Sequence, residues 1–189
     1  MIASIAGKVT EVLSTAVVLE LGGVGYEVRV TSEELIRIRV GQVIKLYIHE
    51  HIREDLHDLY GFAEPAAKTL FEQLIGVSGV GPKVAMAILS AATVDHVRTA
   101  IAADDVGVFE AVAGVGKRTA GRIILELRNK VVGESQAAAE RWKEDPVYEA
   151  LRKFGYAPPA AKEAVKAIPE ELKTDAERIK FALKSLSRQ

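Results

Sequence analysis

The chain contains 189 residues, and its 25 lysines and arginines nearly balance its 26 aspartates and glutamates, for a formal net charge of −1. This balance argues against a protein that coats nucleic acid through a uniformly positive surface, and the 49% hydrophobic content excludes a disordered chain. The sequence has no cysteine, which excludes disulfides, thiolate metal sites and cysteine nucleophiles.

The first 62 residues predict a β-rich segment. Valine, isoleucine and threonine supply 19 of them, whereas only three of the 27 alanines precede residue 63. Because β-branched residues favour strands and alanine favours helices, we expect the change from strand to helix near Phe62. Strands are expected at 2–6, 8–13, 16–21, 25–30, 43–49 and 59–62, with a turn at Gly22-Gly23 and a short helix or irregular excursion at 31–38. This pattern over residues 1–62 fits a small closed β-barrel of the OB type.

Residues 63–133 are expected to form an all-α domain. Helices are predicted at 66–75, 83–91, 94–102, 106–112 and 117–131. Thr93 is a candidate N-cap for the third helix, because its hydroxyl can accept a hydrogen bond from an N–H group of the first turn.

The rest of the chain predicts a linker and a three-helix bundle. Residues 134–145 are polar and contain alanine, and residues 146–189 hold three short helical stretches. The helix ends are marked by Asp145-Pro146, Gly155, Pro158-Pro159 and the capping box Thr174-x-x-Glu177. The expected fold is therefore a β-barrel followed by two helical domains.

The sequence indicates no membrane segment. It has no uninterrupted run of about 18 apolar residues, which a transmembrane helix needs. The apolar stretch at the N-terminus is too short for a signal peptide, and a charged segment follows at once. We expect a cytoplasmic protein.

A short motif occurs twice in the helical segment. The run Gly79-Val80-Gly81-Pro82-Lys83 recurs 35 residues later as Gly114-Val115-Gly116-Lys117-Arg118. Glycines let the backbone turn tightly and approach a ligand, and the first N–H groups of the next helix then point outward as donors. A cation in that first turn opposes the helix dipole, which is reasonable where an anion binds between them. The pattern resembles tandem helix-hairpin-helix motifs, which bind the DNA backbone; alternatively, the glycines only allow helix packing.

The repeat matches no nucleotide-binding fingerprint. A P-loop would need glycine in place of Ala111 and serine or threonine in place of Arg118. A dinucleotide site would need a third glycine where Val84 and Thr119 stand. We therefore expect no cofactor.

Basic residues gather after the second copy of the motif. Residues 117–130 contain five cations and a single acid, namely Lys117, Arg118, Arg122, Arg128 and Lys130 against Glu126. Arg118 and Arg122 are one helical turn apart and share a face. This face either extends the phosphate-binding surface or is an ordinary solvated face.

The run from His49 to Asp58 contains three histidines and four carboxylates. His49 and His51 share a strand face, whereas Glu54 and Asp55 are expected at the tip of a hairpin. Two interpretations follow from the residues, a metal site and a solvated hairpin, and the strand alternation argues against the metal site.

Four stretches together resemble the RuvA family of Holliday-junction-binding proteins. They are Gly22-Gly23-Val24-Gly25-Tyr26-Glu27-Val28, the hairpin from Arg53-Glu54-Asp55 to Leu59-Tyr60-Gly61-Phe62, and the two glycine motifs. The resemblance implies that the protein binds four-way DNA junctions without reading sequence and holds them open. It implies DNA contacts from Gly79, Val80, Gly81, Lys83, Gly114, Val115, Gly116, Lys117, Arg118 and Arg122, and an acidic pin at the junction centre formed by Glu54 and Asp55.

The resemblance also implies partners. The last domain is expected to dock on the hexameric ATPase RuvB through Phe154 and Tyr156, and the junction resolvase RuvC is a further expected partner. One or two homotetramers are expected to hold the junction, with no catalytic residue and no metal in this chain. Two other hypotheses remain open: a metal-dependent nuclease using His49, His51, Glu54, Asp55 and Asp58, and a protein-interaction adaptor whose hairpins are only structural.

Overall fold

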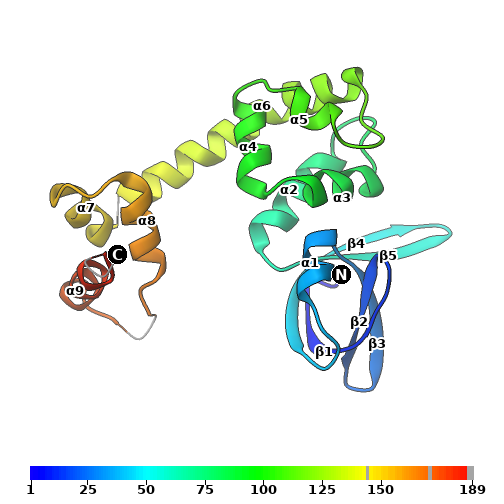
Figure 1. Cartoon of the computed structure of the whole chain (residues 1–189), viewed down its shortest axis with the longest axis horizontal. Coiled ribbons are helices and arrows are strands. Elements are labelled where there is room, and N and C mark those ends of the chain that lie inside the picture. Colours follow the sequence, from blue (N-terminus) through cyan, green and yellow to red (C-terminus); the bar gives the residue numbers. More distant parts are fainter. Residues whose placement is uncertain (144, 170–171, 187–189) are drawn as a thin grey trace. The chain divides into compact units, whose positions relative to one another are not determined.

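The computed structural model describes residues 1–143, 145–169 and 172–186, with the backbone alone described for 132–143. The chain divides into two compact units, Met1–Val131 and Val132–Gln189, called here the first and second units. The first unit contains a closed barrel and a set of helices, and the second contains the end of a long helix and the three helices that follow it (Figure 1).

The barrel has five strands in the closed order β1-β2-β3-β5-β4. Their bounds are β1 Ser4–Val12, β2 Ala16–Leu21, β3 Val24–Arg29, β4 Val43–Arg53 and β5 Leu56–Phe62. The predicted break between strands 2–6 and 8–13 was wrong, because β1 is continuous through Gly7. A Cβ at Gly7 would lie 2.6 Å from the Glu20 carbonyl oxygen, so the glycine allows close approach to β2 instead of ending the strand.

The barrel core and its turns follow the predicted pattern. Inward residues of the five strands form one apolar cluster, which includes Ile5, Val9, Leu19, Val28 and Ile48. The β2–β3 turn has Gly22 and Gly23 at positive φ, as tight hairpin turns require. The excursion at 31–38 contains helix α1, Ser32–Arg37, which begins with a capping box between Thr31 and Glu34.

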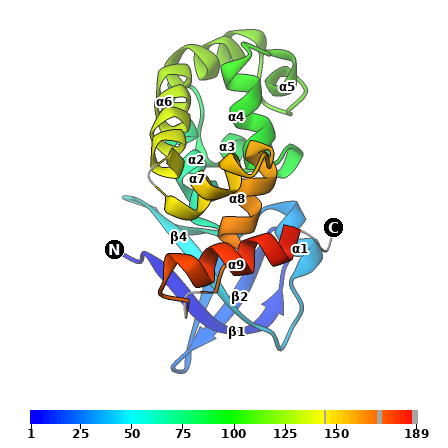
Figure 2. The ribbon, with the colours of Figure 1, turned by 90° about the vertical axis from the view of Figure 1, so that its left-hand side faces the viewer.

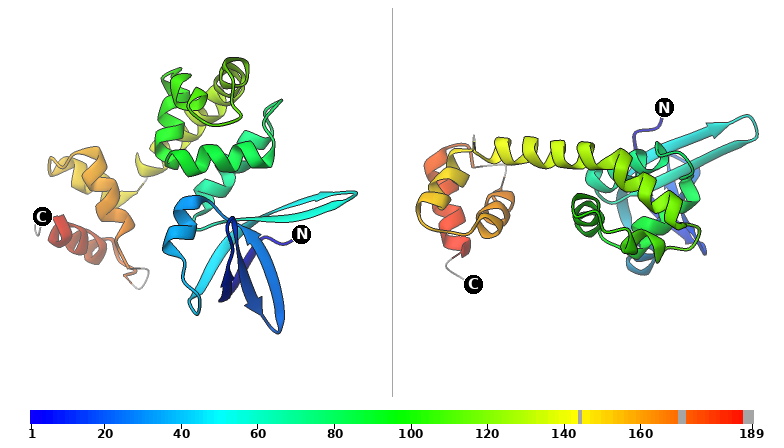
Figure 3. Two further views of the ribbon diagram at one scale, coloured as in Figure 1. Left: turned by 45° about the vertical axis from the view of Figure 1, so that its right-hand side comes forward. Right: turned by 90° about the horizontal axis from the view of Figure 1, so that it is seen from above.

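The β4–β5 hairpin is longer than predicted and extends away from the barrel (Figures 1 and 3). Its strands pair from Tyr47 and Phe62 at the base to Arg53 and Leu56 next to the turn. The predicted strands stopped at 49 and began again at 59 because the polar run between them carries no alternating burial pattern. That run instead pairs with itself across a two-residue turn.

The helices of the first unit are α2 Pro65–Ile75, α3 Pro82–Ala91, α4 Val94–Ala102, the short α5 Gly107–Glu110 and the start of α6. Thr93 caps α4 as predicted, accepting a hydrogen bond from the His96 N–H group. Their core includes two barrel residues, Tyr60 and Phe62, whose rings lie 5.1 and 5.0 Å from the Phe71 ring. The barrel and helices are therefore packed through a common aromatic cluster.

Helix α6 runs from Lys117 to Lys143, beyond the predicted end at 131. It includes residues 134–143 of the expected linker. This stretch is rich in glutamate, glutamine, alanine, lysine and arginine, which are good helix formers, and the single Gly133 does not interrupt the helix.

The second unit contains α7 Pro146–Lys153, α8 Pro158–Lys166 and α9 Asp175–Leu186 (Figure 2). Asp145 caps α7 by accepting from the N–H groups of Val147 and Tyr148. Gly155 has φ +88°, which suits the turn that ends this helix. The small core is made of Val147, Leu151, Ala161, Ala164, Val165 and Ala182.

Within the described ranges, no single helix is long and apolar enough to cross a membrane; α3 and α4 meet that test only as a pair bent by 100°.

Candidate nucleic-acid interface

The two glycine motifs form equivalent hairpins. The first hairpin, residues 76–81, joins α2 to α3, and the second hairpin, residues 111–116, joins α5 to α6. In each, the second valine donates its N–H to the carbonyl of the first, Val80 to Val77 and Val115 to Val112, both at 3.0 Å. Gly79 and Gly114 have φ values of +91° and +88°. A left-handed residue is required at this point of each turn, which explains this pair of glycines.

The other glycine pair, Gly81 and Gly116, has no such backbone explanation. Neither residue has a positive φ, and a Cβ added to either would meet nothing within 4 Å. Packing and backbone strain therefore do not require glycine at these two positions. Their open space lies beside the first turn of the following helix, where a missing side chain leaves the backbone accessible to a ligand.

The valines of the motif pack into the helical core beneath each hairpin. Val80 and Val115 are 4% and 6% exposed and belong to the helical core. Each backbone N–H group is already used in its own turn. Among the predicted DNA contacts, these two residues shape the hairpin, and their side chains are almost completely buried.

The first turns of α3 and α6 differ in the number of free backbone N–H groups. The carbonyls of Gly81 and Gly116 accept the first helical hydrogen bonds, from Ala85 and Ala120 at 3.0 Å. The N–H groups of the residues between each acceptor and its donor have no partner within their helices. In the first motif Pro82 has no N–H group, whereas Lys117 has one at the equivalent position.

The two hairpins lie next to each other. Arg122 on α6 donates from Nη1 to the Ser78 Oγ of the first hairpin at 3.2 Å. In the other direction, the Cβ position of Gly114 lies 3.6 Å from Val84 Cγ2 on α3. Each hairpin therefore touches the helix that follows the other one, which brings both motifs onto one surface.

The cations around the hairpins fall into two groups. Lys83, Lys117 and Arg118 are exposed beside the hairpins. Arg128 instead pairs with Asp104, Nη1 to Oδ2, at 2.6 Å. The predicted run of basic residues on α6 therefore has fewer unpaired cations than its composition indicates, because Arg128 already has an acidic partner.

Glu54 and Asp55 occupy the two-residue turn at the tip of the β4–β5 hairpin, and both are exposed. Below the tip, His57 Nε2 lies 2.9 Å from Glu50 Oε1. The Ile2 backbone N–H donates to the other oxygen of Glu50 at 3.0 Å and holds the pKa of this carboxyl below its ordinary value. The hairpin is thereby tied to the N-terminal residues that precede β1.

The three histidines of the hairpin are dispersed. His49 and His51 share a face, with ring centroids 6.3 Å apart, as the strand pattern predicted. His49 Nδ1 lies 3.1 Å from Glu72 Oε1 on α2, whereas His57 contacts Glu50. Across the residues that the structure describes, no three histidines or carboxylates are grouped so that they could hold a metal ion.

The predicted docking pair in the second unit has two different environments. Phe154 is 66% exposed at the end of α7. Tyr156 packs against the core of the unit, and its N–H donates to the Leu151 carbonyl at 3.2 Å. Phe154 is accessible to a partner, whereas Tyr156 contributes to the fold of the bundle.

Two families match this chain. The RuvA N terminal domain matches residues 1–61, and the SAM-like helix-hairpin-helix tandem matches residues 71–129. The matched regions are the barrel with its long hairpin and the helices that carry both glycine hairpins.

Relatives match over nearly the whole length. Proteins from Chromobacterium violaceum and Herpetosiphon aurantiacus are 40% and 38% identical, over 98% and 97% of this chain and the same shares of their own lengths. A protein from Acinetobacter baumannii is 39% identical over 98% of this chain and 99% of its own. Each of the three is named Holliday junction branch migration complex subunit RuvA. With this identity over this coverage, and with the barrel and paired hairpins in place, the chain belongs to the RuvA family.

Proposed function

We propose that the protein binds four-way DNA junctions through the phosphate backbone and takes part in branch migration. The observation that carries this proposal is the pair of equivalent hairpins, whose Gly81 and Gly116 are explained neither by packing nor by backbone strain. The names of the full-length relatives, which refer to a Holliday junction branch migration complex, supply the type of DNA.

Each hairpin binds phosphate with backbone N–H groups and first-turn cations. Lys83 serves the first hairpin, and Lys117 and Arg118 serve the second. Phosphate contacts fix the position of a protein on DNA without reading base sequence, so binding is sequence-independent. It also weakens with salt, by about 0.9 in log K per tenfold rise in salt for each phosphate neutralised on duplex DNA.

Glu54 and Asp55 act as a pin at the centre of the junction. Two exposed carboxylates on a projecting hairpin repel phosphate, so a continuous duplex cannot lie across them without an electrostatic penalty. The arms of an open junction can pass around such a point. The pin excludes and positions DNA and performs no covalent chemistry, and we propose that the chain is not an enzyme.

We assign one proposed role to each of the four segments expected from the sequence. Residues 1–62 form the barrel with the pin, 63–133 bind DNA, 134–145 link the parts, and 146–189 dock on RuvB with Phe154 at the contact. A homotetramer fits a four-armed substrate, because one repeated surface then serves each arm. RuvC is a second proposed partner, and the proposed location is the cytoplasm.

A binding and cleavage assay tests the function. The full chain is titrated against a synthetic four-way junction and a linear duplex of matching sequence, with and without Mg²⁺. Tighter binding to the junction without cleavage is expected. Mg²⁺-dependent cleavage would favour a nuclease, absence of binding at low salt would favour an adaptor, and equal affinity for both DNAs would contradict junction specificity.

The pin is tested by the double variant Glu54→Ala with Asp55→Ala. Junction affinity should be kept or increased, and the preference for junction over duplex should fall. The matched control is Glu20→Ala with Glu27→Ala, which removes two exposed carboxylates from β2 and β3 and should leave the preference unchanged. Loss of junction binding in the pin variant would contradict the assigned role.

A further inference from the structure

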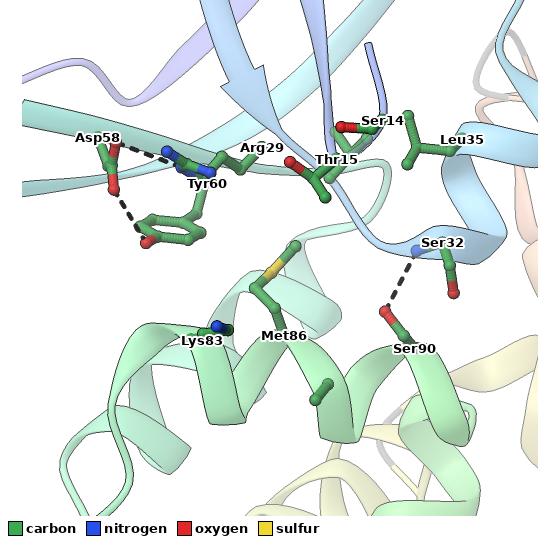
Figure 4. A pocket seen from close by; sticks show the side chains of 12 residues that line it. Ser14, Thr15, Arg29, Ser32, Leu35, Asp58, Tyr60, Lys83, Met86 and Ser90 are labelled. Atoms are coloured by element: carbon green, nitrogen blue, oxygen red, sulfur yellow. Dashed lines mark hydrogen bonds and ion pairs between the residues drawn. The ribbon is translucent and has the colours of Figure 1, made fainter. Parts of the chain in front are cut away.

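A cavity of about 630 Å³ lies between the barrel and helix α3 (Figure 4). This volume is in the range of sites that bind small molecules. The turn after β1, the end of β3, the start of α1, and β5 form its barrel side, and α3 forms the other side. Lys83, two residues after the first hairpin, lines the cavity, so the cavity is next to that hairpin.

One end of the cavity carries two cations and an internal carboxylate. Arg29 Nε lies 3.3 Å from Asp58 Oδ1, and the Tyr60 hydroxyl donates to Asp58 Oδ2 at 3.2 Å. Burial, together with the Asp58 charge, raises the pKa of Tyr60 above its ordinary value. Lys83 is exposed and has no ion-pair partner among the described residues.

The geometry of the ion pair leaves Arg29 able to bind a second anion. The ion pair is measured at Nε, and a guanidinium carries further N–H donors on its two terminal nitrogens, which can bind a ligand. The Arg29 side chain is 40% exposed, whereas that of Asp58 is 18% exposed. An incoming phosphate would therefore meet the guanidinium before it met the carboxylate.

The remaining walls suit the rest of a nucleotide. Hydroxyl groups are present on both sides, and the Ser32 N–H donates to Ser90 Oγ across the cavity at 3.2 Å. Leu35 and Met86 supply apolar surface. A cationic end, hydroxyls and an apolar wall match the phosphate, sugar and base of a nucleotide, in that order.

We propose that this cavity binds a nucleotide phosphate between Arg29 and Lys83, and that Asp58 is an internal anion competing with that phosphate for Arg29. The proposal rests on the proposed function, because its expected source of phosphate is a DNA strand leaving the first hairpin. Lys83 stands at both sites. Asp58 is three residues from the pin along β5, roughly 10 Å at the rise of a strand. A strand diverted by the pin therefore passes near the cavity.

Competition from the Asp58 carboxylate makes binding in the cavity selective. In the absence of a ligand Asp58 neutralises part of the Arg29 charge, which lowers the attraction of this surface for any DNA. A phosphate held by Lys83 and the hairpin at the same time outcompetes the carboxylate. The site then favours DNA that is already positioned by the hairpin.

Three full-length variants, Arg29→Gln, Lys83→Gln and Asp58→Asn, are compared in junction binding by fluorescence anisotropy across a salt series. Arg29→Gln should weaken binding about tenfold, the loss of one charged hydrogen bond. It should also reduce the slope of log K against log salt by about 0.9, and Lys83→Gln should reduce it similarly. Asp58→Asn should tighten binding about threefold, the scale of a partly exposed ion pair.

The matched controls are Arg37→Gln and Glu33→Gln. They remove the two partners of another arginine–carboxylate pair of the first unit, on α1 and outside the cavity. Neither should change affinity or slope. Thermal melting checks the fold of each variant, and Asp58→Asn keeps the test valid if Arg29→Gln is unstable, since Asp58 lines the cavity and belongs to neither hairpin.

The outcomes separate this inference from the proposed function. If the unmodified protein does not bind the junction, the proposed function fails. If it binds and Gly81→Asp weakens binding while folded Arg29→Gln and Asp58→Asn match the unmodified protein, the proposed function stands and the DNA strand is excluded as the source of the phosphate in the cavity.

The source of the phosphate is tested by equilibrium dialysis with thymidine monophosphate. Retention that is lost in Arg29→Gln assigns the cavity to free nucleotides. No retention, together with Arg29-dependent junction binding, assigns it to the DNA strand. Dependence on Arg29 in neither assay contradicts the proposal.

Discussion

The first and second hairpins have the same backbone conformation but differ in the N–H donors and cations that follow them. Their turns, buried valines and open glycines are equivalent residue by residue at an offset of 35. The first motif continues with proline and one lysine, the second with lysine and arginine. The valines and glycines that the two motifs share form the turn. The residues that follow, which differ, determine the number of N–H donors and the charge. We therefore expect the second hairpin to contribute more to affinity and the first to connect DNA with the barrel.

The largest effects are expected from the open glycines. Gly116→Asp should weaken binding to junction and duplex by about a hundredfold and Gly81→Asp by about tenfold, because a carboxylate then occupies the phosphate position. Melting temperatures should hardly change, since neither new side chain meets a neighbour within 4 Å at its Cβ. Anisotropy titrations measure this. The alanine variants at both positions are the controls and should lose less, and equal losses at the two glycines would break the expected asymmetry.

The salt dependence should separate the hairpins by their charge. The double variant Lys117→Gln with Arg118→Gln should lower the slope of log K against log salt by about 1.8, and Lys83→Gln by about 0.9. Arg128→Gln is the matched control on the same helix, because Asp104 already neutralises this arginine. A slope change in the control as large as in Lys83→Gln would mean that the stripe of cations acts as a whole.

A smaller effect is expected from the contact between the hairpins. Ser78→Ala removes the acceptor of the Arg122 hydrogen bond without changing charge. It should weaken binding about threefold, a typical value for one hydrogen bond, with an unchanged salt slope. If the slope also falls, Arg122 has lost a phosphate contact that Ser78 was positioning, and the two hairpins do not act independently.

The smallest effect is expected from Pro82→Ala, which gives the first helix start the N–H group that the second already has. Affinity should increase about twofold, within the value of one added hydrogen bond. Stability should fall by about 0.4–1 kcal/mol, because the unfolded chain gains freedom. Calorimetry and anisotropy together check this. A loss of affinity would show that the ring of Pro82 itself helps to shape the hairpin.

The sequence was informative where the determinants are local. The hairpins and the Gly22-Gly23 turn were predicted because each needs glycine at fixed nearby positions, and the cap at Thr93 depends only on the next turn. The α6 end was missed because good helix formers continue through 134–143. The β4–β5 hairpin was underestimated because its outer part buries little, so pairing rather than hydrophobicity determines its length.

The parts of the site that the sequence did not predict depend on distant pairing. Ser78 and Arg122 are 44 residues apart and meet only after the helices pack. Arg29 and Asp58 come together because β3 and β5 run in parallel, with Arg29 beside Tyr60, and no local pattern specifies that register. The sequence lists the cations and carboxylates. Only the folded structure shows which of these cations already have an acidic partner.

The aromatic cluster that joins the barrel to the helices has a consequence for cooperativity. Tyr60 and Phe62 end the strand that carries the pin, and their rings pack on Phe71 of α2. A fragment cut at residue 62 would expose these faces to water on both sides, so we expect each half to be less stable alone than within the chain. We therefore expect the barrel and the hairpin helices to unfold as one cooperative unit. The proposed pin and the proposed DNA-binding hairpins would then lose their structure together.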